Sequence, residues 1–160
     1  MPPLRDAELT ALTPADAGEV LTLQRAAYAS EAQLYADPLL PALTQSLEEL
    51  REELTADGGY GLRLGPRLVG AVRTRVRGEE VHVGRLTVVP DLQGRGLGSR
   101  LLEAAETGSG ASWAVLFTGH LSVANLRLYR RRGYRETHRT SLREGVDLVH
   151  LRKDLREDLR

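Results

Sequence analysis

The sequence predicts a mixed α/β (α+β) fold built on one central sheet of about seven strands, in the order β-α-α-β-β-β-α-β-α-β-β. Short turns that contain Gly or Pro join three apolar segments between residues 60 and 89, which indicates a meander of antiparallel strands. A glycine-rich turn at residues 94–98 then opens a stretch whose apolar residues recur at helical spacing. The apolar run 113–118 follows, and a strand, helix and strand in this order predict a parallel pair.

Length and composition predict one domain. The 160 residues suffice for a single core, and we expect one domain over residues 1–160 with a charged tail at 152–160. Because the chain has no cysteine, a disulfide, a cysteine nucleophile and a thiolate metal site are excluded, and we expect no metal. The absence of a long apolar run and of a signal peptide predicts a cytoplasmic protein without a membrane partner. The 22 basic and 22 acidic residues balance, which argues against nucleic acid as a partner.

Capping signals locate the helices of the first third of the chain. Thr13, followed by a proline, predicts a helix start, and the apolar stripe of that helix ends near Ser30. Residues 29–44 hold two prolines and have the composition of a loop. A capping-box pattern that begins at Ser46 predicts a second helix, and a Gly-Gly pair ends it.

Seven segments have the composition of strands. They are residues 7–11, 60–64, 68–76, 81–89, 113–118, 134–142 and 146–151. Because the run 113–118 is apolar throughout, we expect this strand to be buried on both faces. A helix over about residues 97–106 precedes it, and a short helix with Ser122 as N-cap and Gly133 at its C-terminal end follows it.

The turn that contains Gly94, Gly96 and Gly98 predicts an anion site. Without Cβ atoms these positions let a ligand approach the backbone, and free N–H groups at a helix N-terminus favour a phosphate. The turn lacks the lysine of a P-loop, which argues against hydrolysis of a nucleoside triphosphate. A dinucleotide fold is disfavoured because the third glycine comes one position early and an antiparallel meander precedes it. Nucleotide binding stays open as a weaker interpretation.

Two motifs lie in the second half of the chain. The first is Val88-Val89-Pro90, then Gln93-Gly94-Arg95-Gly96-Leu97-Gly98, which fits Gln/Arg-x-x-Gly-x-Gly/Ala, then Leu101-Leu102. The second is Asn125-x-x-Leu128-Tyr129-x-x-x-Gly133-Tyr134. Together they resemble the GNAT superfamily of N-acetyltransferases over about residues 68–151, although the family often has its asparagine where this chain has Ser122. The resemblance implies the GNAT fold, whose central sheet is splayed between the fourth and fifth strands.

The resemblance further implies that the chain binds acetyl-CoA. The amides of the turn would bind the pyrophosphate of coenzyme A, and pantetheine would lie between the splayed strands. Arg95 and Arg100 would add positive charge beside the pyrophosphate. The residues that the resemblance assigns to the cofactor are Thr87, Val88, Val89, Gln93, Gly94, Arg95, Gly96, Leu97, Gly98, Ser99, Asn125 and Tyr129.

The implied reaction is direct transfer of the acetyl group to a primary amine in a ternary complex. The amide of Val88 would polarise the acetyl carbonyl, and Tyr129 would donate a hydrogen bond to the departing thiolate. A base would help, because an alkylamine with a pKa of about 10 is neutral in roughly one molecule in a thousand near neutral pH. His120 is the candidate base, and Glu79, Glu80 and His82 stay open as others.

The acceptor is not identified by these motifs. Tyr28, Glu31 and Tyr35 are candidate acceptor-binding residues with Asp37 beside them, and the acids favour a cationic amine, either a small molecule or a peptide N-terminus. A non-catalytic acyl-CoA-binding sensor or regulatory module is the alternative function. Many members of the family dimerise, so the resemblance also makes a homodimer a candidate assembly.

Overall fold

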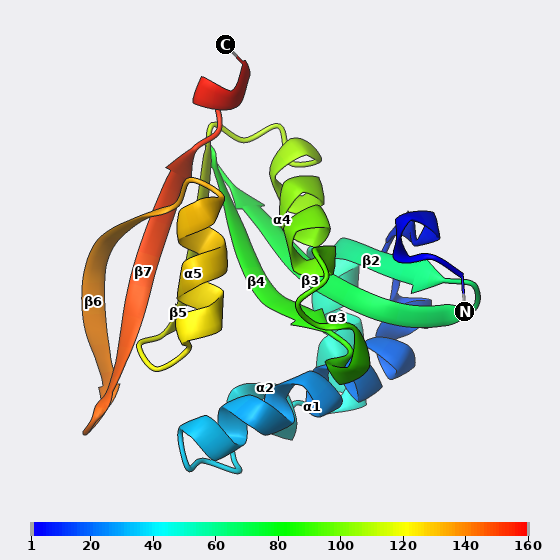
Figure 1. Ribbon diagram of the computed structural model, residues 1–160, viewed down its shortest axis with the longest axis horizontal. Coiled ribbons are helices and arrows are strands. Elements are labelled where there is room, and N and C mark those ends of the chain that lie inside the picture. The colour runs from blue at the N-terminus through cyan, green and yellow to red at the C-terminus, as the bar shows by residue number, and fades with distance from the viewer. Residues whose placement is uncertain (1, 160) are drawn as a thin grey trace.

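The central element of the computed structural model, which describes residues 2–159, is a single mixed sheet (Figure 1). Within these residues seven strands lie in the order β1-β2-β3-β4-β5-β7-β6, and only the pair β4 and β5 is parallel. This arrangement confirms the predicted fold class and the parallel pair. The strands are β1 (Glu8–Ala11), β2 (Gly59–Leu64), β3 (Arg67–Arg77), β4 (Glu80–Val88), β5 (Trp113–Gly119), β6 (Arg135–Arg143) and β7 (Val146–Asp154).

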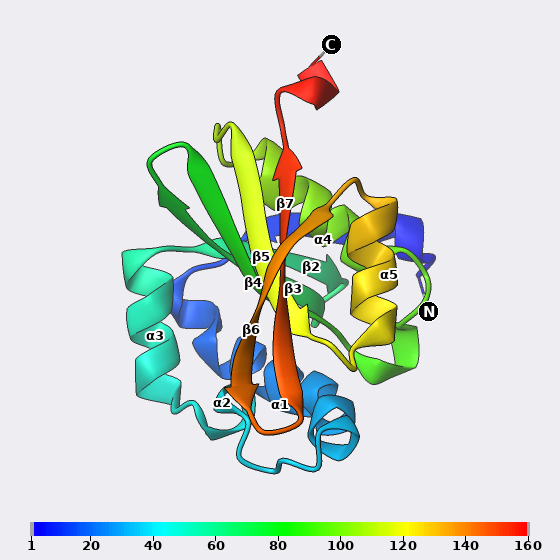
Figure 2. The same cartoon turned by 90° about the vertical axis from the view of Figure 1, so that its left-hand side faces the viewer.

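Helices pack on both faces of the sheet. α4 and α5 lie on one face and α1 and α3 on the other, as Figure 1 and Figure 2 show together. The helices are α1 (Ala17–Leu34), α2 (Pro41–Thr44), α3 (Leu47–Ala56), α4 (Leu97–Thr107) and α5 (Val123–Arg131). The core lies between these layers, and Leu50 of α3, Val81 of β4 and Leu101 of α4 are fully buried in it. No helix of the described chain has the length and apolar character needed to span a membrane.

The first helix is longer than the sequence predicts. α1 does not end near Ser30 but continues through residues 29–34, which contain no proline or glycine and include the helix-favouring residues Ala, Glu and Gln. The expected loop also contains the short helix α2. Buried Gln24 of α1 donates a hydrogen bond to the carbonyl of Ala42 at 2.7 Å, which fixes α2 against α1.

β4 carries a β-bulge. Its residues Arg85 and Leu86 lie opposite the single β3 residue Val72, between the pairs that flank them. Arg85 has a φ of +50°, a left-handed conformation that costs a residue other than glycine about 1–2 kcal/mol. A bulge bends the strand and increases its twist, so it changes the direction of β4 just before the glycine-rich turn.

β4 and β5 diverge after a short parallel ladder. The last of its three residue pairs joins His82 to Val115, whereas β4 continues to Val88. Figure 1 shows the two strands separating from that end toward the glycine-rich turn. The splay implied by the family resemblance is therefore confirmed.

β5 is buried on one face only. Leu116 is buried, whereas the next residue, Phe117, is 60% exposed. The prediction of burial on both faces is wrong because α4 and α5 lie on only one face of this part of the sheet (Figure 2). On the opposite face the ring of Phe117 contacts His150 of β7, with 5.5 Å between the ring centroids.

The predicted tail begins too early, because residues 152–154 complete β7. Lys153, the one lysine of the sequence, points into the protein, and its Nζ lies 3.0 Å from Oε1 of Glu106 on α4. The two side chains are only 9% and 5% exposed. Since a buried charge requires a partner, this ion pair fixes the end of β7 against α4.

Candidate active site

The turn between β4 and α4 presents a row of free backbone N–H groups. Within the described chain, none of the seven amides from Gln93 to Ser99 donates a hydrogen bond to a backbone or side-chain acceptor. Gly94 and Gly96 have φ values of +74° and +86°, which glycine adopts without strain. Buried Leu92 and Leu97 anchor the two ends of the turn. Because the N-terminus of α4 has no side-chain cap, its partial positive charge and these amides favour an anion.

The backbone N–H of Val88 points into the gap between β4 and β5. The amide of Val89 donates to the carbonyl of Val69 on β3 at 2.9 Å. Successive N–H groups of an antiparallel strand point to opposite sides, so the amide of Val88 points away from β3. The ladder with β5 has already ended at this level, and no β5 residue pairs with Val88. Gln93 Nε2 donates to the Val88 carbonyl at 3.0 Å and holds the turn on the strand.

The same alternation corrects two of the predicted cofactor contacts. Thr87 pairs with Ala71 of β3, and Val89 bonds to Val69 of the same strand. The backbone groups of Thr87 and Val89 are therefore directed to β3. Of the three residues expected to bond pantetheine through the backbone, the structure brings only Val88 to the gap.

Tyr129 of α5 is buried, and its hydroxyl makes no hydrogen bond within the described chain. Burial raises the pKa of this phenol above its usual value, and the nearby groups of Tyr28 and Glu31 raise it further. The hydroxyl thus stays protonated at neutral pH and is available as a donor. Asn125, one helical turn earlier, donates from Nδ2 to Oγ1 of Thr118 at 3.4 Å.

The two sequence motifs meet where α4 begins. A Cβ added to Gly98 would lie 3.4 Å from Cδ2 of Leu128, so the first turn of α4 packs directly on α5. The turn that opens α4 therefore lies next to α5, which carries the second motif.

Ser122 connects α1 to the start of α5. Its hydroxyl donates a hydrogen bond to Oε2 of Glu31 at 2.7 Å. Because a hydroxyl has a single proton to donate, the Ser122 oxygen accepts the hydrogen bond from the Tyr35 hydroxyl, also at 2.7 Å. The Tyr35 oxygen accepts in turn from the amide of Leu121 at 3.1 Å. Ser122 holds the N-cap position of α5, but its side chain makes no capping hydrogen bond, which corrects the predicted role.

The predicted acceptor residues differ in what they leave available. Tyr35 is committed to the hydrogen bonds with Ser122 and Leu121, and Asp37 lies 3.7 Å from the guanidinium of Arg143. Glu31 keeps one carboxylate oxygen, Oε1, without a partner in the described chain. Tyr28 has its ring beneath the guanidinium of an arginine on β4. Tyr28 and Glu31 are therefore the acceptor candidates with unused polar groups.

That arginine, Arg85, was missed by the sequence analysis, as was Arg73. The Arg85 guanidinium lies 5.8 Å from the centre of the Tyr28 ring. Arg73, on the adjacent strand β3, is buried and forms an ion pair with Glu53 at 2.9 Å. Burial lowers the pKa of Arg73 to about 10, Glu53 opposes this effect and Arg85 adds to it. No sequence signal marks Arg85, because the bulge that turns it toward α1 depends on the register of β3.

His120 has one ring nitrogen engaged with β7. Its Nδ1 lies 3.0 Å from the amide nitrogen of Asp147 and 3.3 Å from the carbonyl oxygen of the same residue, so it accepts from the first in one tautomer and donates to the second in the other. When Nδ1 carries the proton, the lone pair of Nε2 is available to accept another. His120 therefore stays a candidate base, with its ring held against β7.

Three other residues lie away from the places that their predicted roles require: the candidate bases Glu80 and His82, and Arg100, which was expected beside the pyrophosphate. Glu80 and His82 belong to the closed end of the β4–β5 ladder, opposite the end where the strands diverge. Arg100 donates to the carbonyls of Leu4 and Ala7, at 3.3 and 2.8 Å, so it anchors the N-terminal segment instead of an anion. Arg95, by contrast, is exposed at the turn and makes no hydrogen bond or ion pair within the described chain.

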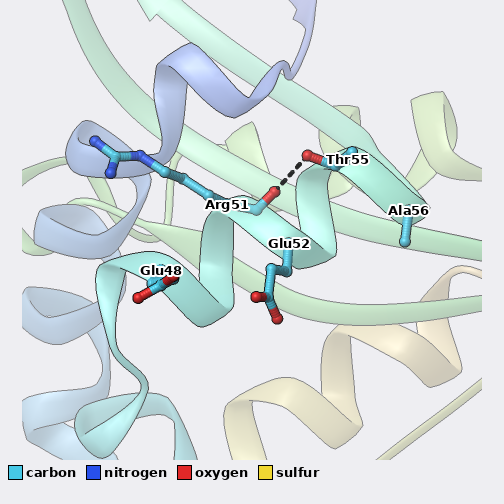
Figure 3. Close-up of a pocket in the computed structure, with 5 residues that line it drawn as sticks. All are labelled: Glu48, Arg51, Glu52, Thr55 and Ala56. Carbon is cyan, nitrogen blue, oxygen red and sulfur yellow. Dashed lines mark hydrogen bonds between the residues drawn. The ribbon is translucent and has the colours of Figure 1, made fainter.

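A separate hollow lies on the outer face of α3 (Figure 3). The side chains that line it are Glu48, Arg51, Glu52, Thr55 and Ala56. The hydrogen bond drawn there, from Thr55 Oγ1 to the Arg51 carbonyl at 2.8 Å, is internal to the helix. None of the predicted site residues lines this hollow. Across residues 2–159 no cluster of three or more His, Asp or Glu side chains is arranged to hold a metal ion.

The sheet, its splay and the two motifs define the class of protein. The family model described as "Acetyltransferase (GNAT) domain" matches residues 28–155. The chain therefore belongs to the GNAT acetyltransferase family. No curated protein sequence matches it.

Solved structures share the fold at low sequence identity. PaiA N-acetyltransferase from Thermoplasma acidophilum, in complex with coenzyme A, matches at a TM-score of 0.78 and 18% identity, over 93% of this chain and 99% of that one. The ribosomal-protein-S18-alanine N-acetyltransferase from Escherichia coli matches at 0.75 and 18%, over 93% and 94% of the two chains. The putative acetyltransferase yncA from Salmonella typhimurium, with acetyl-CoA, matches at 0.71 and 16%, over 93% and 94%.

Proposed function

We propose that the chain is an acetyl-CoA-dependent N-acetyltransferase that moves the acetyl group directly to a primary amine in a ternary complex. The observation that carries the proposal is the row of seven free amides from Gln93 to Ser99 at the open end of the diverging strands. Membership of the GNAT family supports the same conclusion. The similar folds of PaiA with coenzyme A and of yncA with acetyl-CoA add to it.

The residues of the turn fit the pyrophosphate of coenzyme A. Their amides provide several N–H donors, and the α4 N-terminus provides partial positive charge. Cβ atoms at Gly94 and Gly96 would project into open space beside the backbone, where the phosphates would lie. Arg95 is the exposed cation of the turn and would add charge. In this proposal the residues that hold the cofactor are Val88, Gln93, Gly94, Arg95, Gly96, Leu97, Gly98, Ser99, Asn125 and Tyr129.

Two donors have assigned roles in the transfer. When bound, acetyl-CoA supplies an acetyl thioester. The amide of Val88, which points into the gap, donates a hydrogen bond to the carbonyl oxygen and stabilises negative charge there. Tyr129 donates a hydrogen bond to the sulfur as the carbon–sulfur bond breaks, and its raised pKa keeps it in the donor form.

The acceptor, a small molecule or a peptide N-terminus, approaches from the side of α1. The free oxygen of Glu31 pairs with the ammonium form of the amine and holds it beside Tyr28. Loss of one ammonium proton to solvent water produces the neutral amine. Its nitrogen would then form a bond to the carbonyl carbon while the carbon–sulfur bond breaks, and the thiolate of coenzyme A would take up a proton from solvent. Ser122 orients the carboxylate through its hydrogen bond to Oε2.

The test combines binding and turnover. Calorimetric titration with acetyl-CoA should yield a dissociation constant that rises in Gly96→Ala, because the added Cβ strains the left-handed turn and obstructs its amides. Gly78→Ala is the matched control, since Gly78 also has a positive φ, +59°, but lies in the β3–β4 hairpin. Release of free thiol with a panel of amines measures transfer. Binding without transfer to any amine would favour the alternative of a non-catalytic sensor, and no binding would refute both.

A further inference from the structure

Arg85 is partly buried and, unlike the other arginines that are buried or partly buried, lacks an oxygen acceptor within the described chain. Six arginines of the described chain are buried or partly buried, and five of them contact a carboxylate or a backbone carbonyl. These contacts are Arg63 with Asp16 at 3.0 Å, Arg73 with Glu53 at 2.9 Å, Arg100 with the Ala7 carbonyl at 2.8 Å, Arg132 with Glu103 at 3.9 Å and Arg152 with Glu80 at 3.4 Å. Arg85 makes neither a hydrogen bond nor an ion pair within the described chain. Its guanidinium lies instead over the face of the Tyr28 ring.

The position of Arg85 is held at a cost. Its backbone is in the left-handed region at the bulge of β4, in the segment of that strand that has no partner on β5. Arg73 lies close enough that the two guanidinium groups repel each other. Glu53 forms its ion pair with Arg73 and accepts its other hydrogen bond from Gln45, so it does not neutralise Arg85. A partly buried cation without an anion is unfavourable, so this arrangement suits a ligand that supplies one.

Arg85 also lies near the reacting centre. It precedes Val88 by three residues, which is about 10 Å along an extended strand and less across a bulge. Its side chain reaches toward α1, where Tyr28 and Glu31 are three residues apart and share one face of the helix. An arginine side chain and a small acceptor together span this distance.

The second charge of this cluster is of opposite sign. The Glu31 carboxylate accepts from Ser122, and it has no cationic partner in the described chain. The wall formed by α1 and β4 thus offers one unpaired carboxylate for an ammonium group and one unpaired guanidinium for an anion. A guanidinium binds a carboxylate through two parallel hydrogen bonds, which makes it selective for that group.

We infer that the acceptor is a small amine that also carries a carboxylate, such as a free amino acid, and that Arg85 binds this carboxylate while Glu31 binds the amine. The inference rests on the proposed transfer reaction and narrows its acceptor. A peptide N-terminus is then a poor acceptor, because its α-carboxylate is replaced by an amide.

The experiment compares each L-amino acid with its α-carboxamide as acceptor for the full chain, with release of free thiol from acetyl-CoA as the readout. A hydrogen bond to a charged group predicts a kcat/KM about 10- to 100-fold higher for the best amino acid than for its amide. In Arg85→Gln this ratio should fall toward one, and in Arg85→Lys it should be intermediate. Arg51→Gln, on the outer face of α3, is the control and should keep the ratio of the unsubstituted protein.

Several outcomes would overturn the inference. A ratio near one in the unsubstituted protein would do so without any variant, which covers the case that Arg85→Gln does not fold. An unchanged ratio in a folded Arg85→Gln would assign Arg85 a purely structural role. A preference for succinyl-CoA over acetyl-CoA that depends on Arg85 would place the carboxylate on the acyl chain instead. Binding of acetyl-CoA without transfer to any amine would refute the proposed function and this inference together, whereas transfer without carboxylate preference would refute the inference alone.

Discussion

Replacement of Tyr129 by phenylalanine is expected to lower kcat about 10- to 150-fold and to leave stability nearly unchanged. The hydroxyl has no hydrogen-bond partner in the described chain, so its loss breaks no bond of the free protein. During the reaction the hydroxyl would face a sulfur that gains negative charge. A hydrogen bond to a charged group contributes about 1.5–3 kcal/mol, and each 1.36 kcal/mol changes a rate about tenfold.

The raised pKa of Tyr129 restricts how it acts. A phenol with the usual pKa of about 10 is already a weaker acid than a thiol at about 8.5, so full proton transfer to the thiolate costs about 2 kcal/mol. Burial raises the pKa of Tyr129 further and increases this cost. We therefore expect a hydrogen bond that strengthens as the sulfur leaves. For the same reason kcat should show no loss from ionisation of Tyr129 below about pH 10.

The assay measures kcat by thiol release at saturating acetyl-CoA and acceptor, with the acetyl-CoA dissociation constant determined separately. Tyr134→Phe is the matched control, because its ring lies 5.9 Å from that of Tyr129 and its hydroxyl is also buried without a partner. Tyr134 has no assigned role in the reaction, and its variant should keep kcat within about twofold. An unchanged kcat in Tyr129→Phe, or an equal loss in both variants, would refute the reasoning.

Three further substitutions test other parts of the structure. Arg95→Ala should raise the acetyl-CoA dissociation constant more at low than at high ionic strength, because salt screens exposed charges. An equal rise at both ionic strengths would contradict a charge contact between Arg95 and the cofactor. Lys153→Met should destabilise the fold by about 3–5 kcal/mol at neutral pH, since it leaves the Glu106 carboxylate buried and unpaired. Burial already raises the pKa of Glu106, so its protonated form stabilises the fold below about pH 4.5, and this contribution is lost as the pH rises. The loss of stability in Lys153→Met, measured by urea unfolding, should therefore be smaller at pH 4.5 than at pH 7. Gly119→Ala should lower the free energy of unfolding by about 1–3 kcal/mol and raise the KM for the acceptor, because its methyl group would overlap the Tyr35 hydroxyl. An unchanged thermal unfolding temperature would mean that the Tyr35 side chain moves aside without cost.

Local patterns in the sequence were sufficient for the order of the elements and for the glycine-rich turn. The capping box at Ser46 is present, with both of its reciprocal hydrogen bonds. The left-handed conformations of Gly94 and Gly96 occur at residues that adopt them without strain. These features depend on contacts between near neighbours in the chain, so a sequence motif can report them.

Side-chain roles were predicted less well, because they depend on distant partners. Arg100 has the right chemistry for the predicted role, but two backbone carbonyls of the N-terminal segment occupy its guanidinium. The serine predicted to cap α5, Ser122, instead donates to a carboxylate of α1. No local pattern encodes any of these pairings.

The sequence by itself determined the sheet with its crossover and the glycine-rich turn, since these follow from periodicity and from glycine positions, and its two motifs carried the resemblance to the GNAT family that the family model confirms. Only the tertiary structure decided which groups remain free for a ligand. The register of β3 against β4 directs the amide of Val88 into the gap and turns Arg85 toward α1. The packing of α1 on the sheet then brings Glu31 to the same wall. Whether a polar group already has a hydrogen-bond partner or remains available to a ligand depends on all its neighbours in space, so it is decided only in the folded chain.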